Sequence, residues 1–185
     1  MRDHKEGRLS GWLRRRRFNA VLPHVTGKVA DVGCGIGRFA QHVSPDRYLG
    51  IDVNERALDV ARQSFPNHRF VSVEEIGVLD PESFDTVTCL AVIEHLKDPG
   101  LVLGEAYRLI RPSGAMVITT PHPSLEFVHT IGSRLGLFSR EAENEHETLF
   151  HKSELERMLR DARFKPTHYS RFLLGGNQLI VALKS

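Results

Sequence analysis

The stretch Val29-Ala30-Asp31-Val32-Gly33-Cys34-Gly35-Ile36-Gly37 decides the fold, because an apolar run passes directly into glycines at every second position. A short apolar run that ends in a glycine turn is typical of a buried parallel strand. The glycines let the backbone turn sharply and approach a ligand closely. Asp52 ends the next apolar run, where nucleotide-binding α/β folds place an acid that accepts hydrogen bonds from ribose hydroxyls.

The glycine spacing separates two classes of ligand. The dinucleotide fingerprint G-x-G-x-x-G requires a third glycine, and Arg38 stands at that position here. Asp31 beside the loop would repel a pyrophosphate and suits a ligand that carries an ammonium and a sulfonium. A glycine turn that binds nothing is the alternative, and the strand, Asp31 and Asp52 in register argue against it.

Apolar runs alternate with amphipathic stretches along the 185 residues, which predicts one α/β domain with a mostly parallel sheet. Two late strands joined by a short link would pair antiparallel. Strands are expected at 28–32, 48–53, 68–73, 84–90, 115–120, 165–172 and 178–183. Helices are expected at 8–22, 38–43, 54–64, 98–110 and 153–162. Asn54, Asp98 and Ser153 are expected as N-caps, and Glu156 as the partner of Ser153 in a capping box.

Four motifs at characteristic spacing carry a family resemblance. They read VADVGCGIGRFA, YLGIDVN, FDTVTCLAVIEHL and RLIRPSGAMVITTP. The chain resembles the class I S-adenosylmethionine-dependent methyltransferases, especially the compact branch that acts on small molecules and includes the ubiquinone-biosynthesis type. The resemblance is strong over about 28–122 and weaker at the C-terminus. It implies a Rossmann-like sheet of seven strands with an antiparallel last strand and helices on both faces.

The resemblance also implies the residues that hold S-adenosylmethionine and its product S-adenosylhomocysteine. Gly33, Cys34, Gly35 and Gly37 form the loop around the methionine part. Asp31 orients that part, and the Leu90 carbonyl receives its amino group. Asp52 takes the ribose hydroxyls, and Val53 packs on the adenine. The family often has an acid after the third strand that accepts the adenine amino group. Ser72 and Val73 occupy this region here, so Ser72 or a backbone group is expected to replace the acid.

Two histidines follow strands at the edge where ligands bind in open α/β folds. His95 follows the fourth predicted strand and His122 follows the fifth. Either is a candidate general base for a hydroxyl acceptor, and the alternative is a packing or capping role. A metal site from Glu94, His95 and the later histidines is disfavoured, because no pair has close ligand spacing. No metal is therefore expected.

Residues 121–150 form a long insertion, and loops of this length in small domains are usually functional. Phe127, Ile131 and Leu135 share a helical face and are expected to form a wall of the acceptor pocket. His129, His146 and His151 are expected to be solvated. The predicted organisation is a helical cap at 1–27, a cofactor-binding core at 28–120, this insertion as a lid, and a C-terminal helix with a strand pair at 151–185.

The composition of the chain gives limited information about its partners and its cellular compartment. A net charge of +2 and a charged share of 26% predict no particular partner. Arg14 to Arg17 form a basic run beside Trp12 and Leu13, which is either a solvated helix face or a weak contact with an anionic membrane surface. Cys34 and Cys89 show no disulfide or metal spacing, and the start lacks a signal sequence. A soluble cytoplasmic protein is expected.

The sequence therefore predicts methyl transfer from S-adenosylmethionine to oxygen, nitrogen or carbon of a partly apolar small molecule. Two alternatives stay open. An RNA or protein methyltransferase is one, although the exit of the fourth strand, CLAVIEHL, lacks the Asn/Asp-Pro-Pro-aromatic loop of many such enzymes. A regulatory subunit that binds the cofactor without catalysis is the other.

Overall fold

The computed structural model describes residues 8–124 and 148–185 and consists of one sheet between two layers of helices. The strands are β1 Val29–Val32, β2 Tyr48–Asp52, β3 Arg69–Ser72, β4 Phe84–Leu90, β5 Ile110–Pro121, β6 Phe164–Phe172 and β7 Asn177–Lys184. The α-helices are α1 Arg8–Val21, α2 Glu55–Ser64, α3 Pro99–Leu109 and α5 Lys152–Asp161. Short 3₁₀ segments lie at Leu22–His24, Ala40–His42, Pro45–Arg47, Val73–Val78 and Ile93–His95.

The seven strands run in the order β3-β2-β1-β4-β5-β7-β6. The first five pair in parallel, whereas β7 pairs antiparallel with both β5 and β6. The predicted seven-stranded sheet with an antiparallel end is confirmed. The order reverses between β1 and β4, which is the switch point where open α/β sheets bind ligands.

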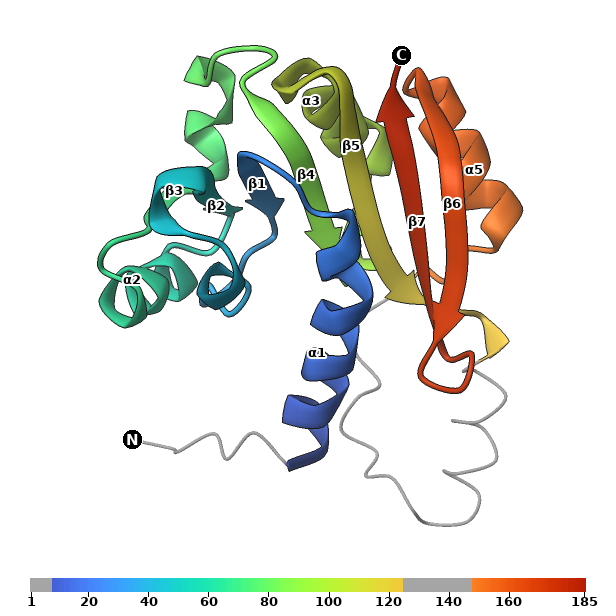
Figure 1. Ribbon diagram of the computed structural model, residues 1–185, viewed down its shortest axis with the longest axis horizontal. Helices are drawn as coiled ribbons and strands as arrows, with labels where there is room; N and C mark the ends of the chain where they lie inside the picture. The colour runs from blue at the N-terminus through green and yellow to red at the C-terminus, as the bar shows by residue number, and fades with distance from the viewer. Residues whose placement is uncertain (1–7, 125–147) are drawn as a thin grey trace.

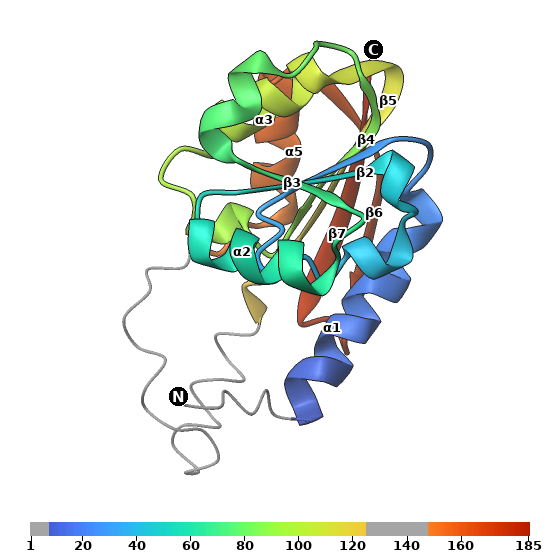
Figure 2. The same cartoon turned by 90° about the vertical axis from the view of Figure 1, so that its left-hand side faces the viewer.

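Helices cover both faces of the sheet, as predicted (Figures 1 and 2). On one face Leu103 of α3 and Leu155 of α5 are buried in the larger core cluster. On the other face Phe18 and Val21 of α1 join Leu58 of α2 in a second cluster. In Figure 1, α1 lies in front of the strands and extends beyond the edge at which β4 and β5 end.

Local capping explains where two of the helices begin. Asn54 caps α2 by accepting from the Ala57 N–H at 3.3 Å, and Asp98 caps α3 by accepting from the Gly100 N–H at 2.9 Å. Both predictions are confirmed. The prediction for α5 is wrong by two residues: the helix begins at Lys152, and the capping-box pair is His151 with Glu154, whose carboxylate accepts from the His151 N–H. Glu156 instead forms ion pairs within α5.

The predicted helix at 38–43 is also wrong. Hydrogen bonds there span three residues, from the Ala40 N–H to the Gly37 carbonyl and from the Val43 N–H to the Ala40 carbonyl, so only a 3₁₀ turn forms. Gly37 has a left-handed φ of 74°, and Pro45 keeps Ser44 extended. The segment between Gly37 and Ser44 is too short to form a stable α-helix. No helix N-terminus therefore faces the ligand edge after the glycine loop.

None of the helices in the described ranges combines the length and the apolarity needed to cross a membrane.

Candidate active site

The glycine loop is held to β2 by backbone hydrogen bonds. The N–H groups of Gly33 and Cys34 both donate to the Ile51 carbonyl, at 2.8 and 3.1 Å. The Gly35 N–H donates to the Asp52 carboxylate at 2.7 Å. The predicted loop and the predicted acid are thus brought into direct contact, and the loop is fixed in place before any ligand arrives.

Two of the loop glycines face different surroundings. A Cβ on Gly33, whose φ is 75°, would lie 2.3 Å from a Val92 methyl, whereas a Cβ on Gly35, whose φ is 53°, would meet nothing within 4 Å. Gly33 is therefore required by packing inside the protein. Gly35 lies beside open space, which leaves room for a ligand to approach its backbone.

This difference gives a paired test of the loop. Gly33→Ala should destabilise the protein by about 2 kcal/mol, because the new methyl group overlaps Val92 at an unfavourable φ. Gly35→Ala should cost about 1 kcal/mol of stability for its φ alone and lower S-adenosylhomocysteine affinity at least tenfold, because the methyl group occupies the ligand space. Thermal melts and calorimetry measure both. Equal effects of the two variants on stability, with binding unchanged in Gly35→Ala, would contradict the assignment.

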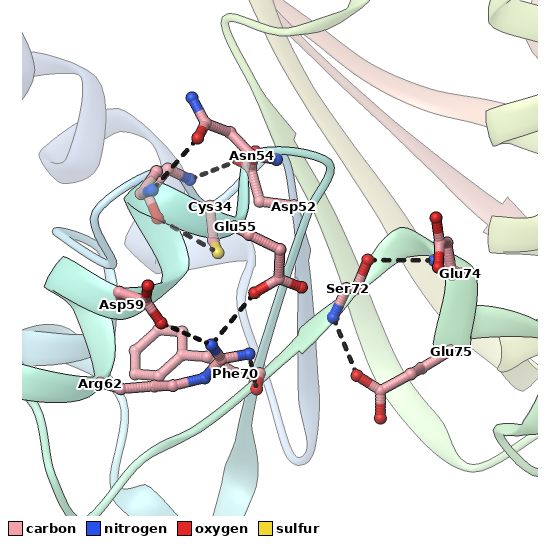
Figure 3. Close-up of polar contacts among 12 residues, drawn as sticks. Cys34, Asp52, Asn54, Glu55, Asp59, Arg62, Phe70, Ser72, Glu74 and Glu75 are labelled. Carbon is pink, nitrogen blue, oxygen red and sulfur yellow. Dashed lines mark hydrogen bonds and ion pairs between the residues drawn. The ribbon is translucent and has the colours of Figure 1, made fainter.

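Asp52 links the glycine loop to the start of α2. One carboxylate oxygen accepts from the Gly35 N–H and the other accepts from the Asn54 N–H at 2.8 Å (Figure 3). A carboxylate oxygen can accept two hydrogen bonds, so both Asp52 oxygens keep capacity for the hydroxyls of a ribose. Val53 follows with 79% of its surface exposed, and this exposed apolar side chain is available to a planar ring.

Asp31 lies in the sheet interior with 3% of its surface exposed. Its two oxygens accept from the Tyr48 hydroxyl at 2.8 Å and the Thr88 hydroxyl at 2.7 Å. Burial raises the pKa of Asp31 to about 6, and these two hydrogen bonds limit the rise. A buried carboxylate that is held by neutral donors alone is incompletely neutralised, so a cationic group of a ligand would stabilise it.

A cavity of about 170 Å³ lies between Asp31 and α1. Gly33, Cys34 and Leu90 line it from the sheet side, and Arg14, Arg17 and Phe18 line it from α1. Arg38 and Phe39, which follow the glycine loop, complete the lining. The cavity thus brings the Asp31 carboxylate together with the guanidinium side chains of Arg14, Arg17 and Arg38. Such a cavity offers a carboxylate to the ammonium of a zwitterionic amino acid and guanidinium groups to its carboxylate.

The sequence pattern placed the two arginines of α1 in a basic run and did not predict that they would line a cavity beside Asp31. Helical periodicity was the available signal: positions 14, 17, 18 and 21 share one face of α1, and Phe18 and Val21 are buried on it. Arg17 is largely enclosed, which lowers its pKa, while the nearby charge of Glu94 acts in the opposite direction.

Ser72 is engaged in local structure. Its hydroxyl accepts from the Glu74 N–H at 3.4 Å, and its own N–H donates to Glu75 at 3.1 Å, which caps the 3₁₀ segment that follows β3. Figure 3 shows Ser72 on the strand next to Asp52, with its hydroxyl turned toward Glu74. Val73 is partly exposed at the same edge. An adenine contact at this position remains a prediction.

Glu94 and His95 lie next to each other in the turn after β4 but differ in burial. Ala91 adopts a left-handed φ of 58° at the start of this turn. Glu94 has 2% of its surface exposed, and its Oε2 atom makes no hydrogen bond to the described residues, whereas His95 is exposed. Burial raises the pKa of Glu94, and its own backbone N–H together with the charges of His95 and Arg17 opposes the rise. The sequence singled out His95, but Glu94 is the side chain that faces inward.

His122 lies just beyond β5, as predicted. Its ring bonds Ser124 at 2.9 Å and lies 6.4 Å from the His151 ring. Partial burial lowers the pKa of His122, and the charges of Arg171 and His151 lower it further. Its neutral form is therefore favoured near pH 7, which is the form that a general base requires.

Most of the insertion, residues 125–147, lies outside the described residues, and so do Phe127, His129, Ile131, Leu135 and His146. Within the described residues, no group of three or more His, Cys, Asp or Glu side chains is placed to hold a metal ion.

Comparison with known proteins places this site in a family. Residues 3–169 match the methyltransferase domain family. A ubiquinone biosynthesis O-methyltransferase from Thiobacillus denitrificans is 32% identical over 162 residues, which cover 81% of this chain and 69% of that protein. The corresponding protein from Paracidovorax citrulli is 32% identical over 83% of this chain and 67% of its own length. The chain thus spans about two thirds of the length of these relatives.

The fold comparison agrees. A methyltransferase structure from Thermotoga maritima, described as dependent on S-adenosylmethionine, superposes with a TM-score of 0.75 at 19% identity, over 95% of this chain and 90% of that one. The order of the strands, the glycine loop joined to Asp52 and the matched sequence all lead to the same conclusion: the chain belongs to the class I S-adenosylmethionine-dependent methyltransferases.

Proposed function

We propose that this enzyme transfers the methyl group of S-adenosylmethionine to a small, partly apolar acceptor, and that the cavity beneath α1 holds the methionine end of the cofactor. The observation that carries the proposal is that Asp31, Arg14 and Arg17 line one cavity, next to the loop joined to Asp52. The charges fit an amino acid, and the open space at Gly35 fits the chain that connects it to a ribose.

Each end of the cofactor has its own set of residues in this proposal. Asp31 and the Leu90 carbonyl receive the ammonium, and the two arginines receive the carboxylate. Asp52 accepts from the ribose hydroxyls. Val53 packs on the adenine, and Val73 and Ser72 lie at the adjoining edge. Cys34 and Gly37 shape the loop from which the Gly35 backbone faces the ligand.

The sulfonium of the bound cofactor supplies an electrophilic methyl group. The protein has to align the acceptor in line with the carbon–sulfur bond and exclude water. Glu94, His95 and His122 lie in the segments that follow β4 and β5, so each is a candidate to take a proton from an acceptor hydroxyl. Glu94 also suits a positioning role, because its inward Oε2 atom can accept a hydrogen bond from the acceptor.

Oxygen is the acceptor atom that we favour, because relatives at about one third identity are named as O-methyltransferases. We also propose a cytoplasmic setting, which the two free thiols of Cys34 and Cys89 support. The test is transfer of isotopically labelled methyl from S-adenosylmethionine to a panel of phenols with and without apolar substituents, with transfer RNA and histone as competing classes. Labelling of RNA or protein above the phenols would contradict the acceptor class.

A pair of variants tests the two ends of the cofactor separately. Arg17→Leu should lower S-adenosylhomocysteine affinity about tenfold to a hundredfold, because a charge-assisted hydrogen bond to the carboxylate is lost. It should leave the affinity for 5′-methylthioadenosine unchanged, because that ligand has no amino-acid end. Asp52→Ala should weaken both ligands by a similar factor, because both carry the ribose hydroxyls. Calorimetry gives all four dissociation constants.

Arg15→Leu is the matched control, since Arg15 is an exposed neighbour on α1 that does not line the cavity. Equal weakening of both ligands by Arg17→Leu would show that the arginine acts on the shape of the site and not on the carboxylate.

A further inference from the structure

An exposed apolar and basic surface lies where α1 meets the turn between β6 and β7. Trp12 of α1 and Leu174 of the turn line a groove of about 480 Å³, together with Arg16, Phe172 and Leu173. Trp12 has 46% of its surface exposed, and Leu174 is fully exposed. We call Trp12, Leu13, Arg15, Arg16 and Leu174 the docking surface.

Two leucines of the turn have an unfavourable backbone conformation, and one of them is fully exposed to solvent. Leu173 and Leu174 have left-handed φ values of 52° and 54°. Tight hairpin turns place Asn or Gly at such positions, because a side chain with Cβ is strained there. The sequence nevertheless has two leucines and leaves the second in solvent. Strain combined with an exposed large apolar side chain marks an interaction site.

The charge of the surface selects the kind of partner. The α1 sequence has five arginines and no acidic residue, and the turn sequence Arg171–Asn177 has none either. Arg15 and Arg16 are exposed, and the Arg16 guanidinium lies 5.3 Å from the centre of the Trp12 ring. The inward arginines, Arg14 and Arg17, line the cofactor cavity instead. The outward pair is thus available to anionic groups.

Basic side chains around tryptophan and leucine are the composition of a segment that inserts into the interface of an anionic bilayer. Tryptophan is favoured at the headgroup level, and an aliphatic side chain at the tip of a turn gains by entering the acyl region. Nucleic acid would use the arginines and the tryptophan but offers little to a fully exposed leucine. We propose that this surface docks the enzyme on anionic phospholipid membranes, with Leu174 and Trp12 inserted and Arg15 and Arg16 on the headgroups.

The position of the surface orients the bound enzyme. The turn between β6 and β7 and the first half of α1 both lie at the end of the sheet where β4 and β5 end, in both views of the fold (Figures 1 and 2). This end also carries the cofactor cavity and Glu94. A docked molecule would therefore turn its acceptor side toward the lipid, where an apolar acceptor accumulates.

Co-sedimentation of the full chain with vesicles tests the proposal. Vesicles of 40% phosphatidylglycerol in phosphatidylcholine should bind the protein, and vesicles of pure phosphatidylcholine should bind it much more weakly. Leu174→Asn should lower the apparent affinity about tenfold, because the apolar insertion is lost. Asn tolerates the left-handed backbone, so this variant should melt at the same temperature or higher. Arg15→Gln with Arg16→Gln should lower the affinity about thirtyfold.

The matched controls lie on other faces of the molecule. Leu101 of α3 is 71% exposed and Arg157 of α5 is exposed, so Leu101→Ser and Arg157→Gln should bind vesicles like the parent. The assay needs no cofactor, so it succeeds or fails independently of methyl transfer. Equal binding to both kinds of vesicle, equal loss in the controls, or tighter binding to RNA than to vesicles would overturn the proposal. A dimer that Leu174→Asn dissociates would also overturn it and would identify a second copy as the occupant.

Discussion

Asp31→Asn should make the ligand-free protein more stable at pH 7.5 and at the same time weaken cofactor binding about a hundredfold. Burial raises the pKa of Asp31 from 3.8 to about 6, so the folded protein carries an unfavourable ionised carboxylate above that pH. A shift of this size corresponds to about 3 kcal/mol. Asparagine removes the charge, and the hydroxyls of Tyr48 and Thr88 can still bond the amide. The same change removes the partner of the cofactor's ammonium.

The pH dependence has a defined sign. Between pH 3.8 and about 6 the folded state binds the Asp31 proton more tightly than the unfolded state does. The contribution of Asp31 to stability is therefore most favourable below pH 3.8, decreases as the pH rises, and levels off above about 6. Cofactor affinity should change in the opposite direction and increase through pH 6, because only the carboxylate attracts the ammonium. Asp31→Asn should flatten both profiles.

Melting temperatures and S-adenosylhomocysteine dissociation constants between pH 5 and 8 provide the test. Asp161→Asn, at an exposed position on α5, is the control and should leave both profiles unchanged. 5′-Methylthioadenosine should bind Asp31→Asn like the parent, since it lacks the ammonium. A variant that is less stable than the parent at pH 7.5 would contradict the prediction and show that the ionised carboxylate stabilises the fold.

Lys184→Met should have the largest effect on stability, with a loss of about 4 kcal/mol. The Lys184 ammonium is buried at the end of α3 and donates to the carbonyls of Tyr107 and Ile110 at 2.9 and 2.7 Å. It also donates to Glu82 at 3.0 Å. Helix-terminal carbonyls have no partner within the helix and favour a cation. Methionine fills the space but leaves both carbonyls without a donor.

Glu82→Gln separates the ion pair of Lys184 from its hydrogen bonds to the two carbonyls. The Glu82 side chain is 53% exposed, so its ion pair is screened by solvent and its loss should cost less than about 1 kcal/mol. Urea denaturation of the two variants measures the difference. Cofactor affinity of the folded Lys184→Met protein should match the parent, because Lys184 does not line the cofactor cavity. Similar losses in the two variants would assign the stability to the ion pair.

The sequence by itself predicted the architecture of the sheet, which the structure confirms, and a cofactor site at the glycine loop, which stays a prediction. Short apolar runs and the glycine loop are local signals, because side-chain periodicity and left-handed backbone depend on a few neighbouring residues. The positions of Asp31, Gly35 and Asp52 followed from spacing alone, and the structure joins the last two by a hydrogen bond. The strand at 84–90 agrees with the prediction at both ends.

Tertiary structure decided what local patterns do not encode. Arg14 and Arg17 line the same cavity as Asp31 because the apolar side of α1 packs on the sheet, which turns two arginines of the run inward and leaves Arg15 and Arg16 exposed. Glu94 is buried and its neighbour His95 is exposed in the 3₁₀ turn that follows β4. Lys184 reaches carbonyls 77 and 74 residues away in the sequence. Each outcome depends on a contact between segments that are distant in the sequence. Burial of apolar surface brings these segments together, and it depends on the whole fold and not on the neighbouring residues in the sequence.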